Sequence, residues 1–332
     1  MPDSLVSSET PALDDRFRPE LIAHCYRMVG SVHDAEDLVQ ETYLRAWRSY
    51  DSFEGRSSVR TWLYRIATNA CLTALEKRGR RPMPTGLGGE ASDPLATLVE
   101  QPEVSWLEPV PDAMVAGAHA DPATAVTTRE SIRLAFVAAL QHLPPRQRAV
   151  LVLRDVLRWR AAEVADLLGT TTAAVNSSLQ RARAQLDRIG LTQDDVTEPT
   201  APDQRALLDR YMAAFESYDV AAMVDLFTDD AVWEMPPYPG WYQGADAIGR
   251  LIAKNCPAER PGDMRLVRAN ANGQPAFAVY MRDGDGEHRA FQIQVLTTTT
   301  SGVAHVGCFF DRTLFETFGL PETYPLTRAR SC

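Results

Sequence analysis

AAEVADLLGTTTAAVNSSLQRARAQL, residues 161–186, contains two apolar-periodic segments separated by a short break. Gly169 is the residue type that commonly follows a helix end, and the threonines at 170–172 can cap the next helix. In the second segment Val175 and Leu179 recur at helical spacing, while short polar and basic side chains occupy the opposite face. A helix, a tight turn and a polar second helix together predict a helix-turn-helix, whose second helix enters the major groove of DNA.

The charge distribution supports nucleic-acid binding by this segment, although the whole chain carries a net charge of −10. Residues 129–190 hold ten basic and five acidic residues, and residues 14–82 hold 12 basic and 10 acidic ones. Residues 83–128 have seven acidic residues and no Lys or Arg, and from 191 onward 20 acidic residues face 12 basic ones. Two basic modules therefore flank an acidic linker. A helical hairpin that serves packing alone remains the alternative to the helix-turn-helix.

The first basic module is predicted to be all-helical. Its apolar residues follow helical spacing in three stretches, of which the first ends at Gly30 and the third follows the loop 51–58. Arg65 and Asn69 lie opposite the apolar stripe of the third stretch. Such a polar face is usually only a solvated surface. Nearby aromatic residues and the basic end at 77–81 favour contact with unstacked bases and their backbone instead.

Composition excludes several other classes of protein. The chain is 45% hydrophobic and 23% charged, as in soluble globular proteins. It has no run of about 18 apolar residues and no secretion signal at its start, which predicts a cytoplasmic protein without a membrane partner. The five cysteines lack CxxC spacing, which argues against a disulfide framework or a structural zinc site. We predict no metal and no cofactor.

From residue 204 the pattern changes. A helix, a strand at 231–235 and a helix at 244–255 precede four β segments separated by turn residues, the first pair being Asn272 and Gly273. This order predicts an α+β domain with a helix-covered, curved antiparallel sheet.

The chain is therefore predicted to have several domains. The boundaries are a disordered N-terminus (1–13), an all-α module (14–82), an acidic linker (83–128), an all-α helix-turn-helix module (129–190), a second linker (191–203), an α+β domain (204–325) and a tail (326–332). A short helix is expected at 94–99 in the acidic linker. Trp106 and Leu107 are too apolar for a free tether and are expected to dock on another part of the chain.

Long segments of the chain resemble a known family. DAEDLVQETYLRAW (34–47) and SFEGRSSVRTWLYRIATNACLTALEKRGRR (52–81) resemble region 2 of the extracytoplasmic-function σ factors of bacterial RNA polymerase. LPPRQRAVLVLRDVLRWRAAEVADLLGTTTAAVNSSLQRARAQL (143–186) resembles their region 4. The C-terminal module resembles the SnoaL-like branch of the NTF2-like fold. The three-part order, with GWYQGADAI (240–248), is similar to the SigG-type subgroup of the family.

The resemblance implies binding to core RNA polymerase, at its β′ coiled coil and β flap, and to the −35 and −10 promoter elements. The residues implied in polymerase binding are Asp34, Asp37, Leu38, Gln40, Glu41, Leu44 and Trp47. Those implied in binding the −10 element are Phe53, Arg60, Thr61, Trp62, Arg65, Asn69, Lys77, Arg78, Arg80 and Arg81. Those implied at the −35 element are Thr172, Ala174, Asn176, Ser177, Gln180, Arg181 and Arg183. Many members carry Arg where Asn176 and Ser178 stand. Arg favours guanine and Asn favours adenine, so the −35 sequence does not follow.

The stretch WEMPPYPGWYQG (233–244) is typical of the wall of a small-molecule pocket. The candidate pocket residues are Trp233, Met235, Tyr238, Trp241, Tyr242, Tyr280 and His305. A rigid loop packed on the sheet or on the helix-turn-helix module is an equal alternative. Acid–base chemistry would require a carboxylate or imidazole in the pocket, and the candidates are Asp229, Asp230, Glu234, His288 and His305. No nucleophile–base pair is evident, so the sequence predicts no catalysis.

The leading hypothesis is a σ factor whose C-terminal domain is a built-in regulator. A σ factor whose C-terminal domain turns over a small molecule is one alternative. A helix-turn-helix regulator that acts without polymerase is another. The sequence leaves open whether a separate anti-σ protein exists.

Overall fold

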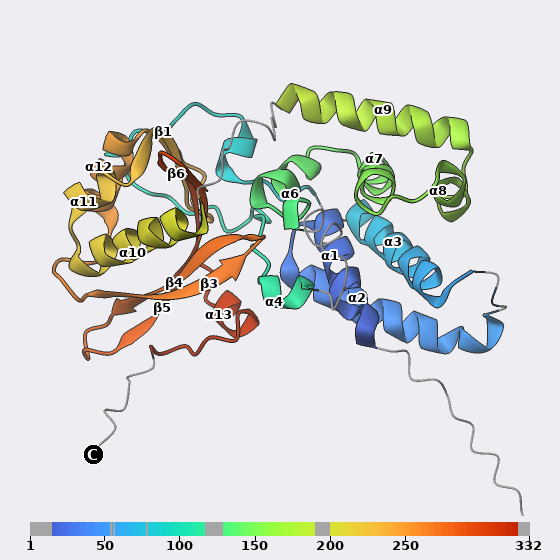
Figure 1. The fold of residues 1–332 in the computed structure, drawn as a ribbon, viewed down its shortest axis with the longest axis horizontal. Coiled ribbons are helices and arrows are strands. Elements are labelled where there is room, and N and C mark those ends of the chain that lie inside the picture. The colour runs from blue at the N-terminus through green and yellow to red at the C-terminus, as the bar shows by residue number, and fades with distance from the viewer. Residues whose placement is uncertain are drawn as a thin grey trace, which may run out of the picture.

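The structure is a computed structural model that describes residues 15–53, 55, 57–77, 79–116, 129–189 and 200–324. The predicted N-terminal segment 1–13, the tail 326–332 and Arg78 lie outside the described residues, as do parts of both linkers. Figure 1 shows a helical half and a half built around a β-sheet, with the acidic linker running between them. None of the described helices is long and apolar enough to cross a membrane.

The helical half consists of two modules. The first contains α1 (Arg18–Val29), α2 (Val32–Arg48) and α3 (Val59–Lys77), with short 3-10 turns at Asp15–Phe17 and Tyr50–Ser52. The second contains α6 (Leu134–Leu140), α7 (Pro145–Leu151), a π-helical turn (Val152–Val156), α8 (Ala161–Leu167) and α9 (Thr172–Ile189). The linker between the modules has a 3-10 turn (Pro84–Leu87) and the short helix α4 (Asp112–Val115).

Local sequence determines several helix ends. Gly30 adopts a left-handed conformation with φ of 72° and donates its N–H to Tyr26 O at 2.8 Å, which ends α1. Ser31 then caps α2, because its hydroxyl accepts the N–H of Asp34 at 3.1 Å. Gly169, with φ of 61°, follows α8 in the same way. The predicted helix ends at Gly30 and Gly169 are confirmed.

Two predicted helices differ in the structure because distant residues contact their backbone. The apolar spacing of residues 129–143 predicts one helix that ends at Pro144. In the structure this helix is interrupted at 131–133, where Ile132 O accepts a hydrogen bond from Asn272 of the C-terminal domain. The helix expected at 94–99 is wrong, because this segment forms only a turn. The carbonyl oxygens of Leu95 and Ala96 there accept from the ammonium group of Lys254.

The C-terminal domain contains a six-stranded sheet in the order β2-β1-β6-β5-β4-β3. The strands are β1 (Phe227–Glu234), β2 (Trp241–Gln243), β3 (Met264–Ala271), β4 (Gln274–Arg282), β5 (His288–Thr299) and β6 (Gly302–Phe309). The β1–β6 pair is parallel and the others are antiparallel, so the sheet is mixed and not purely antiparallel as predicted. The acid–base candidates Asp229 and Asp230 are exposed on β1.

The two faces of this sheet are buried against different partners. Phe277 and Val279 of β4 face α10 (Ala201–Ser217), α11 (Val220–Val224) and α12 (Ala245–Asn255) in one apolar cluster. Their neighbours Ala278 and Tyr280 belong to the other cluster, which is continuous with the helical modules and α13 (Thr313–Thr317). This alternation follows from the two-residue period of a strand. The C-terminal domain therefore shares a core with the helical half. Figure 1 shows the sheet beside the helical modules.

Candidate nucleic-acid interface

Helix α9 presents the polar face that the sequence predicts for DNA contact. Val175, Leu179 and Ala182 are buried against the other helices of the second module. The N–H of Ala174 bonds to Thr171 Oγ1 at 3.2 Å, which supports the start of the helix. The predicted −35 residues are all exposed on the outer side: Thr172, Ala174, Asn176, Ser177, Gln180, Arg181 and Arg183.

Two arginines of this face already have partners within the chain. Arg183 makes a two-pronged contact with Asp155, at 2.9 Å from Nε and 2.6 Å from a terminal nitrogen. Arg181 donates to Ser177 Oγ at 2.7 Å and to Ser178 Oγ at 3.1 Å. Asp155, which lies in the π-helical turn, is absent from the predicted site. Its role in holding Arg183 follows from their contact in the structure, which the sequence alone does not predict.

The outer face of α2 carries exposed apolar residues. Leu44 is 54% and Trp47 is 63% exposed, and Asp37, Gln40 and Glu41 are exposed beside them. Large exposed apolar side chains on one helix face are typical of a protein-binding surface. Two of the residues predicted for polymerase binding do not belong to this exposed surface. Leu38 is buried and Asp34 is covered by Arg81.

The predicted −10 residues lie along α3 and the segments that flank it. Phe53 stacks on Trp62 with ring centroids 4.6 Å apart. Arg60 forms a two-pronged pair with Glu20, and Arg65 pairs with Asp166 of α8. The remaining described members vary in exposure. Asn69, Lys77 and Arg80 are exposed, whereas Thr61 and Arg81 are half-buried.

The two helical modules pack directly on each other through two buried arginines. Arg148 of α7 donates to Met28 O at the end of α1 and to Gln141 Oε1 at 2.7 Å. Arg27 of α1 donates to Ser131 O at 3.2 Å and to Ser131 Oγ at 2.8 Å. Each arginine is 2% exposed, and burial lowers the pKa of each to about 10, so both remain charged at neutral pH.

The acidic linker contacts β1, β2 and the segment between them. The buried Glu234 accepts the N–H of Thr85 at 2.8 Å and contacts His305 Nε2 at 3.2 Å. Burial by itself raises the pKa of Glu234, but the contacts with His305 and Thr85 outweigh it and leave the pKa below its usual value. The other linker contacts involve the pocket-like stretch: Trp241 Nε1 to Gly89 O at 3.1 Å, Ser92 N to Trp241 O at 2.8 Å, Gln101 N to Pro237 O at 2.9 Å and Tyr238 Oη to Glu100 at 3.0 Å.

The sheet divides the candidate pocket residues between its two faces. Trp233 pairs with Tyr242 and packs in the cluster beneath α10 and α12, together with Met235. Tyr280 belongs to the opposite cluster. Of the acid–base candidates, His288 lies at the start of β5 and its Nε2 contacts Gly262 O at 2.7 Å. The seven candidate pocket residues are therefore not brought together at one place.

Asn272 joins the C-terminal domain to both helical modules and to the linker. Its Nδ2 donates to Tyr26 Oη at 2.8 Å and to Ile132 O at 2.7 Å. Its Oδ1 accepts the N–H of Val110 at 3.0 Å, and its own N–H bonds to Val110 O at 2.9 Å. Asn272 is fully buried with φ of 58°, a conformation that Asn tolerates better than most residues. The sequence identifies it only as part of a turn.

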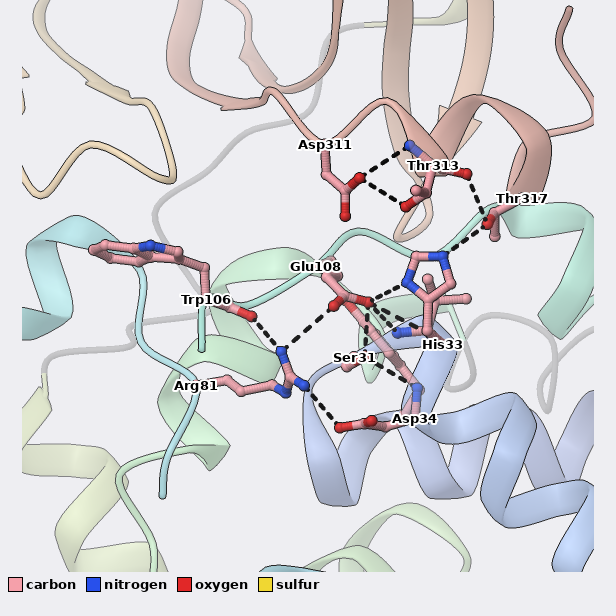
Figure 2. Close-up of polar contacts among 11 residues, drawn as sticks. Ser31, His33, Asp34, Arg81, Trp106, Glu108, Asp311, Thr313 and Thr317 are labelled. Carbon is pink, nitrogen blue, oxygen red and sulfur yellow. Dashed lines mark hydrogen bonds and ion pairs between the residues drawn. The ribbon is translucent and has the colours of Figure 1, made fainter. Parts of the chain in front are cut away.

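Glu108 of the linker closes the start of α2 (Figure 2). Its Oε2 accepts from Ser31 Oγ at 2.7 Å and from Val32 N at 3.1 Å, where a helix N-terminus favours negative charge. Arg81 lies beside it, 2.8 Å from Asp34 and 2.9 Å from Trp106 O. Trp106 and Leu107 are buried here, as predicted for docking residues.

Comparisons with known proteins agree with this architecture. Three family models match: Sigma-70 region 2 at residues 13–81, Sigma-70, region 4 at 133–186, and SnoaL-like domain at 208–310. The ECF RNA polymerase sigma factor SigG of Mycobacterium tuberculosis (strain H37Rv) is 62% identical over 92% of this chain and 82% of its own length. SigJ of the same strain is 32% identical over 72% of this chain and 70% of its own length.

A solved structure shows the same arrangement of modules. The crystal structure of the Mycobacterium tuberculosis extracytoplasmic function sigma factor SigJ matches with a TM-score of 0.61 and 25% identity. The match covers 92% of this chain and 98% of that one. The first helical module is thus σ region 2, the second is σ region 4, and the sheet belongs to a SnoaL-like domain. The chain belongs to the extracytoplasmic-function σ factors of the σ70 family, proteins that direct transcription, and it carries a SnoaL-like domain at its C-terminus.

Proposed function

We propose that this σ factor is held in a closed form by its own C-terminal domain and directs RNA polymerase to promoters after regions 2 and 4 separate. In the open form, the outer face of α2 binds core polymerase, the α3 face binds the −10 element and α9 binds the −35 element. The observation that carries the proposal is the set of hydrogen bonds made by Asn272. One buried side chain of the C-terminal domain holds region 2, the linker and the start of region 4 together.

The spacing of the two promoter elements supports the need for opening. Elements centred about 25 base pairs apart lie about 85 Å apart along B-form DNA, at about 3.4 Å per base pair. Here Arg65 of α3 pairs with Asp166, only six residues before α9 begins. Helix α9 has 18 residues and is therefore about 27 Å long. The two DNA-binding faces are too close together to reach both elements.

The Asn272→Ala variant tests this closure in the full chain. The substitution leaves the buried Ile132 O and Val110 N–H without their partner, each at a cost of about 1–3 kcal/mol. It also removes one of the two hydrogen bonds of the Tyr26 hydroxyl, which keeps its bond to Glu108 O. We expect a larger radius of gyration in small-angle X-ray scattering. We also expect more transcripts in vitro from a promoter library with core polymerase.

The control is Asn270→Ala, which changes an exposed Asn two residues earlier on β3. It should leave scattering and transcription unchanged. If Asn272→Ala opened the chain without altering transcription at any promoter, the regulatory role would be wrong. If neither variant formed transcripts or bound core polymerase, the proposed polymerase and promoter contacts would be wrong.

We assign the C-terminal domain a regulatory and not an enzymatic role. The carboxylate–imidazole pair of Glu234 and His305 supports this, because Glu234 is buried and bonds to the linker backbone. The relatives are named as sigma factors, which favours a σ factor over a helix-turn-helix regulator that acts without polymerase. We place the protein in the cytoplasm because its partners, polymerase and promoter DNA, are there.

A further inference from the structure

His33 links three parts of the chain through one imidazole ring (Figure 2). It is the second residue of α2, in region 2. Its Nδ1 lies 3.0 Å from Glu108 Oε2 of the linker, and its Nε2 lies 3.2 Å from Thr317 Oγ1 of α13 in the C-terminal domain. The side chain is 39% exposed, so protons exchange with solvent without unfolding.

The charged groups around this ring are mainly carboxylates. Glu108 contacts it from the linker, Asp311 acts on it from the segment before α13, and Glu36 acts from its own helix. The nearby cation is Arg81, which lies 3.4 Å from Glu108 Oε1. The positive N-terminus of α2 also disfavours an imidazolium, but the carboxylate of Glu108 at that terminus offsets it. The local field therefore favours the protonated ring.

Both protonation states of the ring fit the observed geometry, with different electrostatics. A neutral ring with its proton on Nδ1 donates to Glu108 and accepts from the Thr317 hydroxyl. A protonated ring donates at both nitrogens, and the Thr317 hydroxyl then turns toward Thr313 O, 3.4 Å away. Only the protonated ring adds charge attraction to Glu108 and Asp311 across the junction.

We propose that His33 is a proton-sensitive latch, which holds region 2 to the linker and the C-terminal domain more tightly when it is protonated. The latch rests on the proposed closure and adds pH as its regulator. The hydrogen bond with Glu108 raises the pKa of His33 above its usual value of 6.5, burial opposes this, and the charges of Glu108, Asp311 and Glu36 add to it.

The sign of the pH effect follows from this direction. A group whose pKa is raised in the closed form contributes its full stabilisation below the ordinary pKa of about 6.5. That contribution is lost as pH rises through the raised pKa of His33. The closed form should therefore loosen as pH rises above about 6.5, within the range where histidine switches operate.

The titration of His33 in the closed and opened chain tests the latch directly. NMR of the imidazole carbon-bound protons gives the midpoint in the full-length wild type and in Asn272→Ala, while scattering reports opening. We expect a midpoint above 6.5 in the wild type. We expect a midpoint lower by about 0.7 pH unit in the opened variant, a coupling of about fivefold. Asn270→Ala, which changes an exposed Asn on β3, is the control and should keep the wild-type midpoint of His33.

A milder variant guards against loss of folding in Asn272→Ala. Glu108→Gln removes the carboxylate charge next to Nδ1 but keeps the shape of the side chain, and it should lower the His33 midpoint. Equal midpoints in the wild type, Asn272→Ala and Glu108→Gln, with scattering that shows Asn272→Ala to be open, would overturn the latch and leave the closure intact. A wild-type midpoint at or below 6.5 would also overturn it. If Asn272→Ala folds but stays closed, the proposed closure fails instead.

Discussion

The two ends of α2 have opposite environments. At its start Asp34 is paired with Arg81, and Glu108 bonds to the first helical N–H groups. At its other end Leu44 is 54% exposed and Trp47 63%. The closed form therefore covers one end of the proposed polymerase-binding helix and leaves the other bare. This contrast between an exposed apolar end and a covered polar end indicates the order in which polymerase binds and the chain opens.

We expect polymerase to contact the exposed end of α2 first. The covered end is held by hydrogen bonds and ion pairs, which a partner or solvent can replace, whereas the exposed end offers apolar area that only a partner can bury. Opening then exposes Asp34 and separates regions 2 and 4.

The largest expected effect comes from the interface between the two modules. Arg148→Ala leaves Met28 O, Gln141 O and Leu143 O without a donor and creates a cavity in a buried site. We expect a loss of about 3–5 kcal/mol in the free energy of unfolding, measured by urea denaturation.

The matched control is Arg146→Ala, an exposed arginine two residues earlier on α7. It should change stability by less than about 0.5 kcal/mol. An Arg148→Ala protein as stable as this control would show that the buried arginine does not hold the modules together.

A smaller effect is expected at the exposed end of α2. Trp47→Ala removes a large apolar side chain that is 63% exposed, so stability should stay within about 0.5 kcal/mol. Binding to core polymerase should weaken by about 2 kcal/mol, roughly 30-fold, as for an aromatic anchor residue. Leu95→Ala, at a 53% exposed site in the linker, should leave this affinity unchanged. Equal affinities of both variants for core polymerase, measured by biolayer interferometry, would remove Trp47 from the binding surface.

The same two ends show what the sequence predicts well. The end of α1 at Gly30 is predicted correctly because a helix end depends on residues within one turn. Leu44 and Trp47, which the family resemblance implies in polymerase binding, are both exposed on α2. The family resemblance adds the modules and their order, which the comparisons confirm.

Contacts between distant segments are what the sequence does not predict. The family resemblance places Asp34 on the polymerase-binding surface of α2, but Arg81, which follows α3, covers it. Asn272 bonds to Val110, 162 residues earlier, and nothing in a turn motif names that partner. The parallel β1–β6 pair likewise joins strands at opposite ends of the domain, whereas turn residues indicate only hairpins.

The smallest expected effect concerns the ion pair between the DNA-binding faces. Arg65 is 46% and Asp166 77% exposed, so water and salt screen their attraction, and Asp166→Asn should cost less than about 1 kcal/mol of stability. The variant also frees Arg65 and removes a negative charge from this face, so its affinity for double-stranded DNA at 50 mM salt should rise by about two- to fivefold. That gain should shrink at higher salt, because phosphate contacts weaken as salt rises. Glu163→Gln is the control, since it removes one negative charge from the same helix at a residue paired with Arg160. A rise in affinity as large in the control would show that overall charge, and not the release of Arg65, governs DNA binding by the closed chain.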